Sequence, residues 1–483
     1  MKLSTLLPPI PLIAAQAGAP VHTTSGTLLG SAGKYAPSVS AYLGVPFAQP
    51  PVGPLRWQPP QKYAAATTAS PRNATKFASD CPGTLSLGGG PGGSEDCLYL
   101  SVWTPAKAGD KLKAVMVWLY GGAFVGGGTA MSMTDGSILA ASQDVVVVAP
   151  NYRLSIFGFP GAPGLKEQNL GLLDQRAAVE WVRDNIKAFG GDPGRITLFG
   201  ESAGAMSVDI YSYAWTSDPI VSGFIGESGA STMCGLISNA SYTNWPKVAA
   251  SLNCTDPATA LPCMSTKSTK DIIAGAKSLG SGFPPKFVPV PDERIAFSDY
   301  PARGAAGKFI KAPFLIGNND REVGSDTHLA DQEFVCPAEQ VSSSRRAHNV
   351  PAWRYRYYGG GPFAGTSLAS MTAASHGSEI SYVFGTLGVS AGFLGGAARA
   401  PSATKKQVSA YIQKAWGAFA RDPVKGLEEL GWPKWESKSK SLIRLAFGNE
   451  TAFSIAQGDQ YDAACAGIQC TYSGGGLSAL GGL

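Results

Sequence analysis

A strand-like run that ends in a glycine–serine motif constrains the fold of this chain more than any other feature. Residues 196–199 are apolar or β-branched, and residues 200–204 read Gly-Glu-Ser-Ala-Gly. Small residues follow, so the segment predicts a strand, a tight turn and a helix in succession. Such a turn exposes the hydroxyl of Ser202, which we expect to be a nucleophile. A second Gly-Glu-Ser run at 226–228 lacks the second glycine at that spacing, and we expect Ser228 to support the site instead.

Short apolar runs alternate with helical patterns along the chain. Strands are expected at 114–120, 145–150, 196–200, 224–227, 313–317 and 353–358. The four valines at 145–148 are apolar on both faces, as in a strand buried in a parallel sheet. The clearest helical stripe spans 172–189 and stops at the Gly-Gly-Asp-Pro run that follows. The alternation predicts a layered α/β fold.

The ends of the chain differ in character from its middle. Residues 1–17 read as a signal peptide, with Lys2, an apolar stretch and a small-x-small cleavage pattern. No internal repeat or linker divides residues 18–473, so we expect a single catalytic domain there. Residues 474–483 form a Gly/Ser-rich tail that we expect to be flexible.

Export to an oxidising compartment has two consequences for covalent chemistry. It predicts disulfides among the eight cysteines. It also permits glycosylation at the Asn-x-Ser/Thr sequons, which are at Asn73, Asn239, Asn253 and Asn449.

Composition argues against several classes of partner. The net charge of +5 includes no Lys/Arg cluster, which a nucleic-acid interface would need. After residue 17, no stretch approaches the roughly 18 consecutive apolar residues of a membrane span. The cysteines lack paired Cys-x-x-Cys spacing, so we expect no metal site, and the chemistry of a serine nucleophile needs no cofactor.

A serine hydroxyl needs a general base and an acid that orients it. The chain has four histidines, and His376 is the best placed, because it follows Ser202 in chain order and lies in a polar loop. The acid should follow a strand and precede His376. Asp320 and Glu322 both do so, and position alone does not choose between them.

The loop at 120–124, Tyr-Gly-Gly-Ala-Phe, follows the strand expected at 114–120. Backbone N–H groups in such a loop can stabilise a developing oxyanion. The residue after the nucleophile, Ala203, supplies another such N–H.

Several motifs in order resemble the type-B carboxylesterase/lipase family. They are 46–48 with 51–56, 95–100, 151–153, 173–175, 189–193 with 200–204, and 376–379. The resemblance implies an α/β-hydrolase fold, with a central, mostly parallel twisted sheet and helices on both faces. It further implies a secreted, fungal-type serine carboxylesterase acting on small-molecule esters.

The resemblance also assigns roles to individual residues. It makes His376 the base and favours Glu322 as the acid. It names three oxyanion donors, which are Gly122, Ala123 and Ala203. In the family a glycine usually follows the acid directly, whereas here Val323 intervenes. The interval from Glu322 to His376 is short, so helices that normally cover the pocket are expected to be missing between residues 322 and 331.

The resemblance pairs Cys81 with Cys97 and Cys254 with Cys263. The pairing of the remaining cysteines stays open, namely Cys234, Cys336, Cys465 and Cys470.

The loop between Cys81 and Cys97 bears on the substrate. It is a long lid in the family's lipases, but here it has fifteen residues and no aromatic one. We therefore expect activity on soluble or small acyl esters, without interfacial activation or a preference for choline. The alternatives are a triacylglycerol lipase and a catalytically inactive, cholinesterase-like adhesion protein. Four aromatic residues are candidate pocket walls: Phe124, Trp215, Phe384 and Trp416.

Overall fold

The computed structural model describes residues 17–65, 70–85, 93–106, 111–280, 284–360, 373–389 and 400–467. Its strands are β1 Val21–Thr23, β2 Gly26–Leu29, β3 Ser31–Ala32, β4 Val39–Pro46, β5 Arg72–Asn73, β6 Tyr99–Pro105, β7 Lys113–Leu119, β8 Val146–Pro150, β9 Gly191–Glu201, β10 Gly223–Glu227, β11 Phe314–Asn319, β12 Ala352–Tyr357, β13 Lys440–Leu445 and β14 Phe453–Gln457. Its α-helices are α1 Ser137–Gln143, α2 Ser155–Gly158, α3 Leu170–Asn185, α4 Ala203–Ala214, α5 Ala240–Ser251, α6 Ala260–Ser265, α7 Thr269–Ser278, α8 Tyr300–Ala305, α9 Thr327–Ala330, α10 Cys336–Ala347, α11 Ile380–Phe384 and α12 Ala403–Arg421.

The described residues form an eleven-stranded sheet in the order β14-β13-β12-β11-β10-β9-β7-β8-β6-β4-β3. The pairs from β8 through β7 and β9 to β13 are parallel, whereas β3, β4, β6 and β14 pair antiparallel at the two sides. A three-stranded sheet, β1-β2-β5, lies beside it. The carboxyl ends of the central parallel strands therefore meet at one edge, which is where such sheets place their sites.

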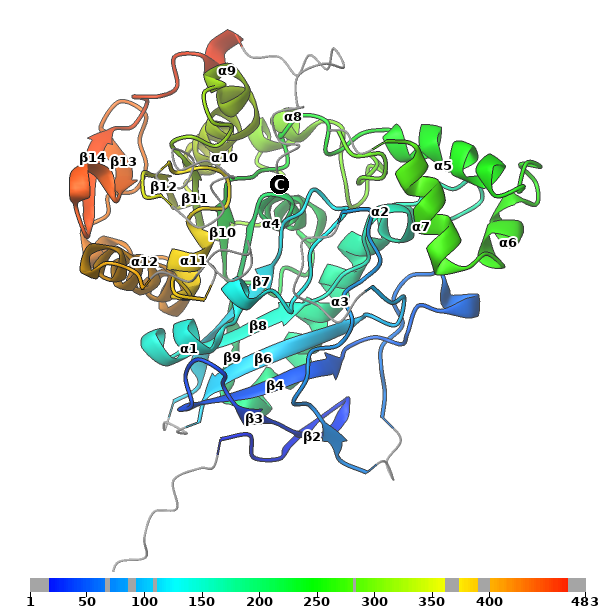
Figure 1. The fold of residues 1–483 in the computed structure, drawn as a ribbon. Coiled ribbons are helices and arrows are strands. Elements are labelled where there is room, and N and C mark those ends of the chain that lie inside the picture. The colour runs from blue at the N-terminus through cyan, green and yellow to red at the C-terminus, as the bar shows by residue number, and fades with distance from the viewer. Residues whose placement is uncertain are drawn as a thin grey trace, which may run out of the picture.

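Helices cover both faces of the large sheet (Figure 1). One layer contains α1, α11 and α12, which contact one another and the strands β4 to β9. The other contains α3, α4 and α10, which contact β7 to β12. The main hydrophobic core fills the space between these layers and the sheet. This is the mostly parallel sheet with helices on both faces that was expected, and the fold class is confirmed.

Each strand expected from the sequence is present, with ends shifted by a few residues. The helical stripe expected at 172–189 is α3 followed by the 3-10 turn Ile186–Phe189. Gly190 ends it with φ of 80°, a left-handed conformation that favours glycine.

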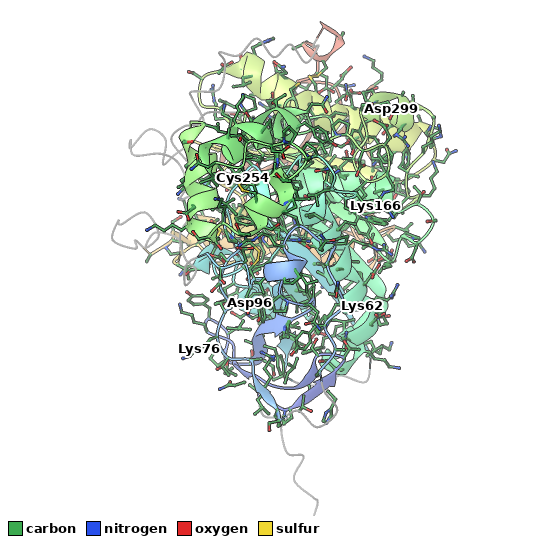
Figure 2. All side chains as sticks on the ribbon, turned by 90° about the vertical axis from the view of Figure 1, so that its right-hand side faces the viewer. Lys62, Lys76, Asp96, Lys166, Cys254 and Asp299 are labelled. Carbon is green, nitrogen blue, oxygen red and sulfur yellow. A yellow bond between two sulfur atoms is a disulfide. The ribbon has the colours of Figure 1, made fainter. Side chains whose placement is uncertain are left out.

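A second hydrophobic core lies under α5, α6 and α7, which form a helical group at the side of the sheet (Figure 1). Trp57 and Trp245 meet edge to face at its centre, with ring centroids 4.9 Å apart. The bond between Cys254 and Cys263 closes the loop between α5 and α6, and Figure 2 labels Cys254 there.

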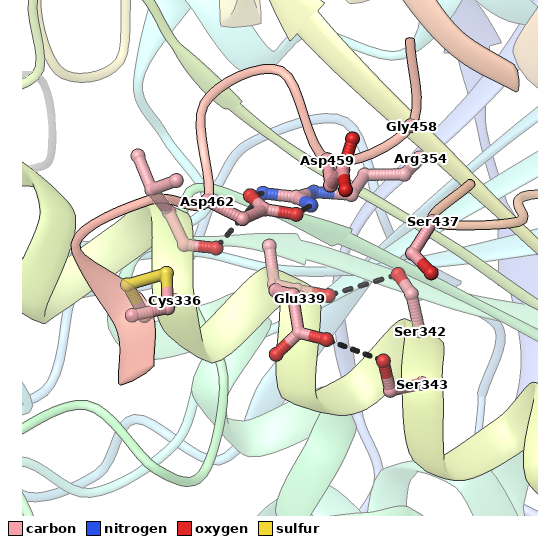
Figure 3. A network of polar contacts seen from close by, with 12 residues as sticks. Cys336, Glu339, Ser342, Ser343, Arg354, Ser437, Gly458, Asp459 and Asp462 are labelled. Atoms are coloured by element: carbon pink, nitrogen blue, oxygen red, sulfur yellow. Dashed lines mark hydrogen bonds and ion pairs between the residues drawn. A yellow bond between two sulfur atoms is a disulfide. The ribbon is translucent and has the colours of Figure 1, made fainter. Parts of the chain in front are cut away.

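A disulfide and an ion pair hold the chain's last described segment against the sheet (Figure 3). Cys336, at the start of α10, is bonded to Cys465. The buried guanidinium of Arg354 on β12 pairs with Asp462 through Nη1, at 2.7 Å. The expected pair Cys81–Cys97 is also joined. Cys234 is disulfide-bonded as well, and Cys470 lies outside the described residues.

The remaining predictions concern the surface and the ends of the chain. Asn73, Asn239 and Asn253 are exposed, whereas the side chain of Asn449 lies outside what the structure describes. Residues 1–16 of the expected signal peptide and the tail at 474–483 also lie outside it. Over the described ranges, no helix combines the length and apolar character needed to cross a membrane.

Candidate active site

The strand β9 leads into a strained turn at Ser202, from which α4 begins. Ser202 has φ of 56° and ψ of −123°, a conformation that costs free energy and persists only where the surroundings enforce it. Both motif glycines are needed for steric reasons. A Cβ at Gly200 would lie 2.6 Å from the carbonyl oxygen of Leu119, and one at Gly204 would lie 1.9 Å from the same atom. The N–H of Ser202 donates to the carbonyl of Glu227 at 2.9 Å.

His376 lies in the loop before α11, between two carboxyl groups. Its Nδ1 is 2.7 Å from Oε2 of Glu322, and its Nε2 is 3.2 Å from Oε1 of Glu201. The ring also packs against Phe334, with centroids 4.9 Å apart. Because Glu201 directly precedes Ser202, these contacts bring the imidazole to the end of β9.

The structure separates the two acids that sequence position left open. Glu322 is buried, and its Oε1 accepts the N–H of Asn319, at the end of β11, at 2.6 Å. Asp320 instead pairs with Arg356 on β12, with Oδ1 to Nε at 3.1 Å. Val323 does not disturb this arrangement, because Gly324 completes the turn after it with φ of 60°. The short helix α9 and a π-helical turn, Asp331–Val335, follow directly.

Burial and charge act on the ionisable groups in opposite directions. Burial lowers the pKa of His376, but the charge of Glu201 and the hydrogen bond and charge of Glu322 outweigh it and raise the pKa to about 9. Burial also raises the pKa of Glu201, to about 7. The two carboxyls therefore favour the protonated form of the imidazole over the neutral form.

The loop after β7 presents backbone N–H groups to the same region. Gly122, Ala123 and Phe124 have φ of 107°, 53° and 62°, three left-handed conformations in succession. Within the described ranges, the N–H groups of Gly122, Ala123 and Ala203 donate to no other protein group. A Cβ at Gly121 would lie 3.0 Å from Cβ of Ser202, so the loop passes directly beside the serine.

A cluster of polar side chains surrounds the loop that carries His376. Ser228 donates through Oγ to Oε1 of Glu379 at 3.2 Å. Asn319 donates through Nδ2 to the carbonyl of Ser375 at 2.8 Å and also to Glu379. Glu379 and Asn319 were not singled out from the sequence as site residues. The sequence signal that could have pointed to Glu379 is a carboxyl directly before an apolar run, in a chain with few charged residues.

Two of the four aromatic residues expected to line the pocket lie in the hydrophobic core. Phe384 is fully buried between Trp118 and Phe199, with ring centroids 5.0 Å and 5.8 Å away. Trp416 is in the core and donates its indole N–H to Glu227 at 2.7 Å. Both expectations are corrected, because these side chains are enclosed by protein and cannot contact a substrate.

Trp215 is displaced for a different reason. It caps the C-terminal end of α4, whose twelve residues begin after Ser202. At 1.5 Å per residue the helix separates the two by roughly 18 Å. The ring of Trp215 instead lies under the guanidinium of Arg176, whose Cζ is 4.7 Å from the ring centroid. Phe124 lies in the loop that carries the free N–H groups, but its side chain is fully buried and packs against Phe159, with ring centroids 5.2 Å apart.

A strained serine turn at the end of a central parallel strand, with a histidine and a buried carboxyl on later loops, is the arrangement of an α/β-hydrolase. The model of the carboxylesterase family matches residues 17–327 and 324–463. The chain therefore belongs to the carboxylesterase family, and it is a carboxylic ester hydrolase. The two matched segments meet at residues 324–327, within the stretch from 322 to 331 where helices of the family were expected to be missing.

Individual relatives agree with this assignment. The chain is 34% identical to a chlorogenic acid esterase of Aspergillus niger, covering 91% of this chain and 92% of that protein. It is 32% identical to the secreted lipase 5 of Gibberella zeae, covering 89% and 90%. Among solved structures, a PNB esterase superposes with a TM-score of 0.80 at 28% identity, covering 92% of this chain and 98% of that one.

Proposed function

We propose that the protein is a secreted serine carboxylesterase that works through an acyl-enzyme, with Ser202 as nucleophile, His376 as base and Glu322 as acid. The observation that carries the proposal is the 2.7 Å contact between His376 Nδ1 and Glu322 Oε2. It leaves Nε2 facing the end of the strand that carries the strained Ser202, where the imidazole accepts a proton once it is in its neutral form.

The proposed reaction has two similar halves. Ser202 Oγ bonds to the ester carbonyl carbon while its proton passes to His376 Nε2. The N–H groups of Gly122, Ala123 and Ala203 stabilise the oxyanion. The bond to the alcohol oxygen then breaks as that oxygen takes the proton from His376. A water molecule repeats the cycle on the acyl-enzyme and releases the acid.

A fluorophosphonate probe tests the assignment of the nucleophile. The folded wild-type protein should be labelled, and Ser202→Ala should not be. An unlabelled wild type, or a labelled variant, would contradict the proposal.

We further propose that the substrates are soluble or small acyl esters, and that the protein is not a triacylglycerol lipase. The support is the short, aromatic-free loop between Cys81 and Cys97, together with the name of the chlorogenic acid esterase among its relatives. Chlorogenic acid, a short-chain ester and an emulsified triacylglycerol can be compared directly. Rates should follow dissolved ester, and a jump in activity at the onset of emulsion would favour the lipase.

Secretion is proposed from the signal-like residues 1–17, with 18–473 as one catalytic domain. The name of the Gibberella relative and the disulfides of the structure support export. Expression of the full chain with N-terminal sequencing of the medium protein tests it, and retention inside the cell would contradict it.

A further inference from the structure

Glu227 is a buried carboxyl next to the nucleophile that the proposed reaction does not use. It ends β10, and its backbone carbonyl accepts the N–H of Ser202. Its side chain is 0% exposed. Oε1 accepts the indole N–H of Trp416, whereas Oε2 is buried and has no hydrogen-bond partner in the part of the chain that the structure describes. As a carboxylate, Glu227 would leave a charged oxygen unsatisfied, an arrangement that proteins avoid.

The register of the sheet explains why Glu227 has so few partners. Glu201, Glu227, Gly317 and Tyr355 lie in one row across β9, β10, β11 and β12. Gly317 has no side chain, and the ring of Tyr355 fills the space, since a Cβ at Gly317 would lie 2.4 Å from that ring. Tyr355 packs on Trp416, with ring centroids 5.3 Å apart. Two aromatic rings and a second carboxyl therefore surround Glu227.

The ionisable groups that face Glu227 offer it no compensating charge. They are Glu201 on β9, Glu379 before α11 and Tyr355 on β12. Burial, followed by the charge of Glu379, raises the pKa of Glu227 well above its usual value. The hydrogen bond from Trp416 opposes this shift without reversing it.

We propose that Glu227 is protonated in the folded enzyme at neutral pH and acts as a neutral positioning residue for Ser202. Oε1 accepts from Trp416, and the proton resides on Oε2. The neutral side chain fixes the end of β10, and with it the carbonyl that holds the Ser202 N–H. It does so without adding a negative charge to the two carboxyls that already contact His376.

The substitution Glu227→Gln tests protonation, because an amide keeps the shape and one acceptor but cannot ionise. When the wild type unfolds above about pH 5, Glu227 releases its proton, so the folded state binds one proton more than the unfolded state. Its stability then falls as pH rises, by about a factor of ten per pH unit in the unfolding equilibrium. E227Q has no proton to release at this position, so its unfolding equilibrium lacks this pH dependence. In urea unfolding from pH 5 to 7, the unfolding equilibrium of the wild type should therefore shift toward the unfolded state, relative to that of E227Q, by about tenfold per pH unit.

A matched control is Glu429→Gln, the same chemical change on an exposed residue. It should leave the pH slope of the wild type unchanged. Equal slopes for E227Q and the wild type would show that Glu227 is ionised in the folded state and overturn the proposal. Failure of E227Q to fold would overturn it too, because a neutral amide should replace a neutral acid.

Activity provides a second measurement, which rests on the proposed function. Glu227→Ala leaves a cavity and an unpaired Trp416 N–H, and it should lower kcat by about 10²-fold through misplacement of Ser202. E227Q should recover most of this loss. E227Q as inactive as E227A would mean that the charge is required, against the proposal. If the wild type proves not to react with the fluorophosphonate probe, only this measurement is lost, and the unfolding slopes still decide.

Discussion

The Nδ1 atom of His376 lies 2.7 Å from Oε2 of Glu322, and this contact selects Glu322 over Asp320 as the partner of the imidazole. Asp320 is two residues earlier and points to Arg356 instead. Glu322 would hold the imidazole in the tautomer that leaves Nε2 free and would stabilise the imidazolium as it forms.

Glu322→Gln should therefore lower kcat by about 10⁴-fold, because an amide cannot stabilise the imidazolium. Asp320→Asn is the matched control, since it removes a neighbouring carboxylate that faces away from the ring. It should stay within about tenfold of the wild type, the residual cost being the lost pair with Arg356. Steady-state kinetics on a soluble ester would measure both, and the opposite ranking would make Asp320 the acid.

Gly121→Ala should impair catalysis by crowding the oxyanion loop against the serine. Its Cβ would lie 2.5 Å from Oε2 of Glu201 and 3.0 Å from Cβ of Ser202, so the loop or the serine must move. Displaced donors should lower kcat by about 10²-fold, as the loss of an oxyanion donor does. Gly467→Ala is the control, because a Cβ there meets nothing within 4 Å among the residues that the structure describes. Equal activity of the two variants would show that the loop tolerates the shift.

The charge of Glu201 should set the pH at which the base becomes available. Glu201 and Glu322 stabilise the protonated imidazole and raise the pKa of His376 to about 9 against the effect of burial. Glu201→Gln removes one of these charges, so the pKa of His376 should fall. The neutral base then forms at lower pH, and the acidic limb of kcat/KM should move down by about one pH unit.

The pH profile of kcat/KM on a soluble ester measures this shift. Glu429→Gln again serves as a control for the loss of one exposed negative charge. An unmoved limb, or one displaced to higher pH, would show that Glu201 does not act on His376 in this way.

The bond between Cys336 and Cys465 should contribute more stability than the bond between Cys254 and Cys263. Their sequence separations are 129 and 9 residues. In the chain-entropy account, closing the longer loop destabilises the unfolded chain by about 5 kcal/mol and the shorter by about 3 kcal/mol. Replacing each pair by serines and measuring urea unfolding should give this order. A reversed order would show that strain or residual structure outweighs loop length.

Local features of the sequence were sufficient to predict a candidate nucleophile and the class of fold. The turn at Ser202 was predicted from a motif of five consecutive residues, although the steric need for Gly200 and Gly204 comes from Leu119 at the end of β7. The alternation of strands and helices depends on hydrophobic periodicity, which is also local. His376 followed from its place in the chain order and from the small number of histidines.

Other assignments required distances between segments far apart in the chain. Only the turn after β11 decided that Glu322, and not Asp320, faces His376. Only packing showed that Phe384 and Trp416 belong to the core, because an aromatic residue looks the same in a sequence whether it lines a pocket or fills an interior.

The sequence by itself thus predicted the candidate serine and histidine and the layered fold, since each prediction depends on neighbouring residues or chain order. The tertiary structure showed which carboxyl contacts His376 and which groups surround Glu227. The row from Glu201 to Tyr355 exists only once four strands have paired in register. Proximity across strands depends on that register and on burial, and neither is a property of consecutive residues.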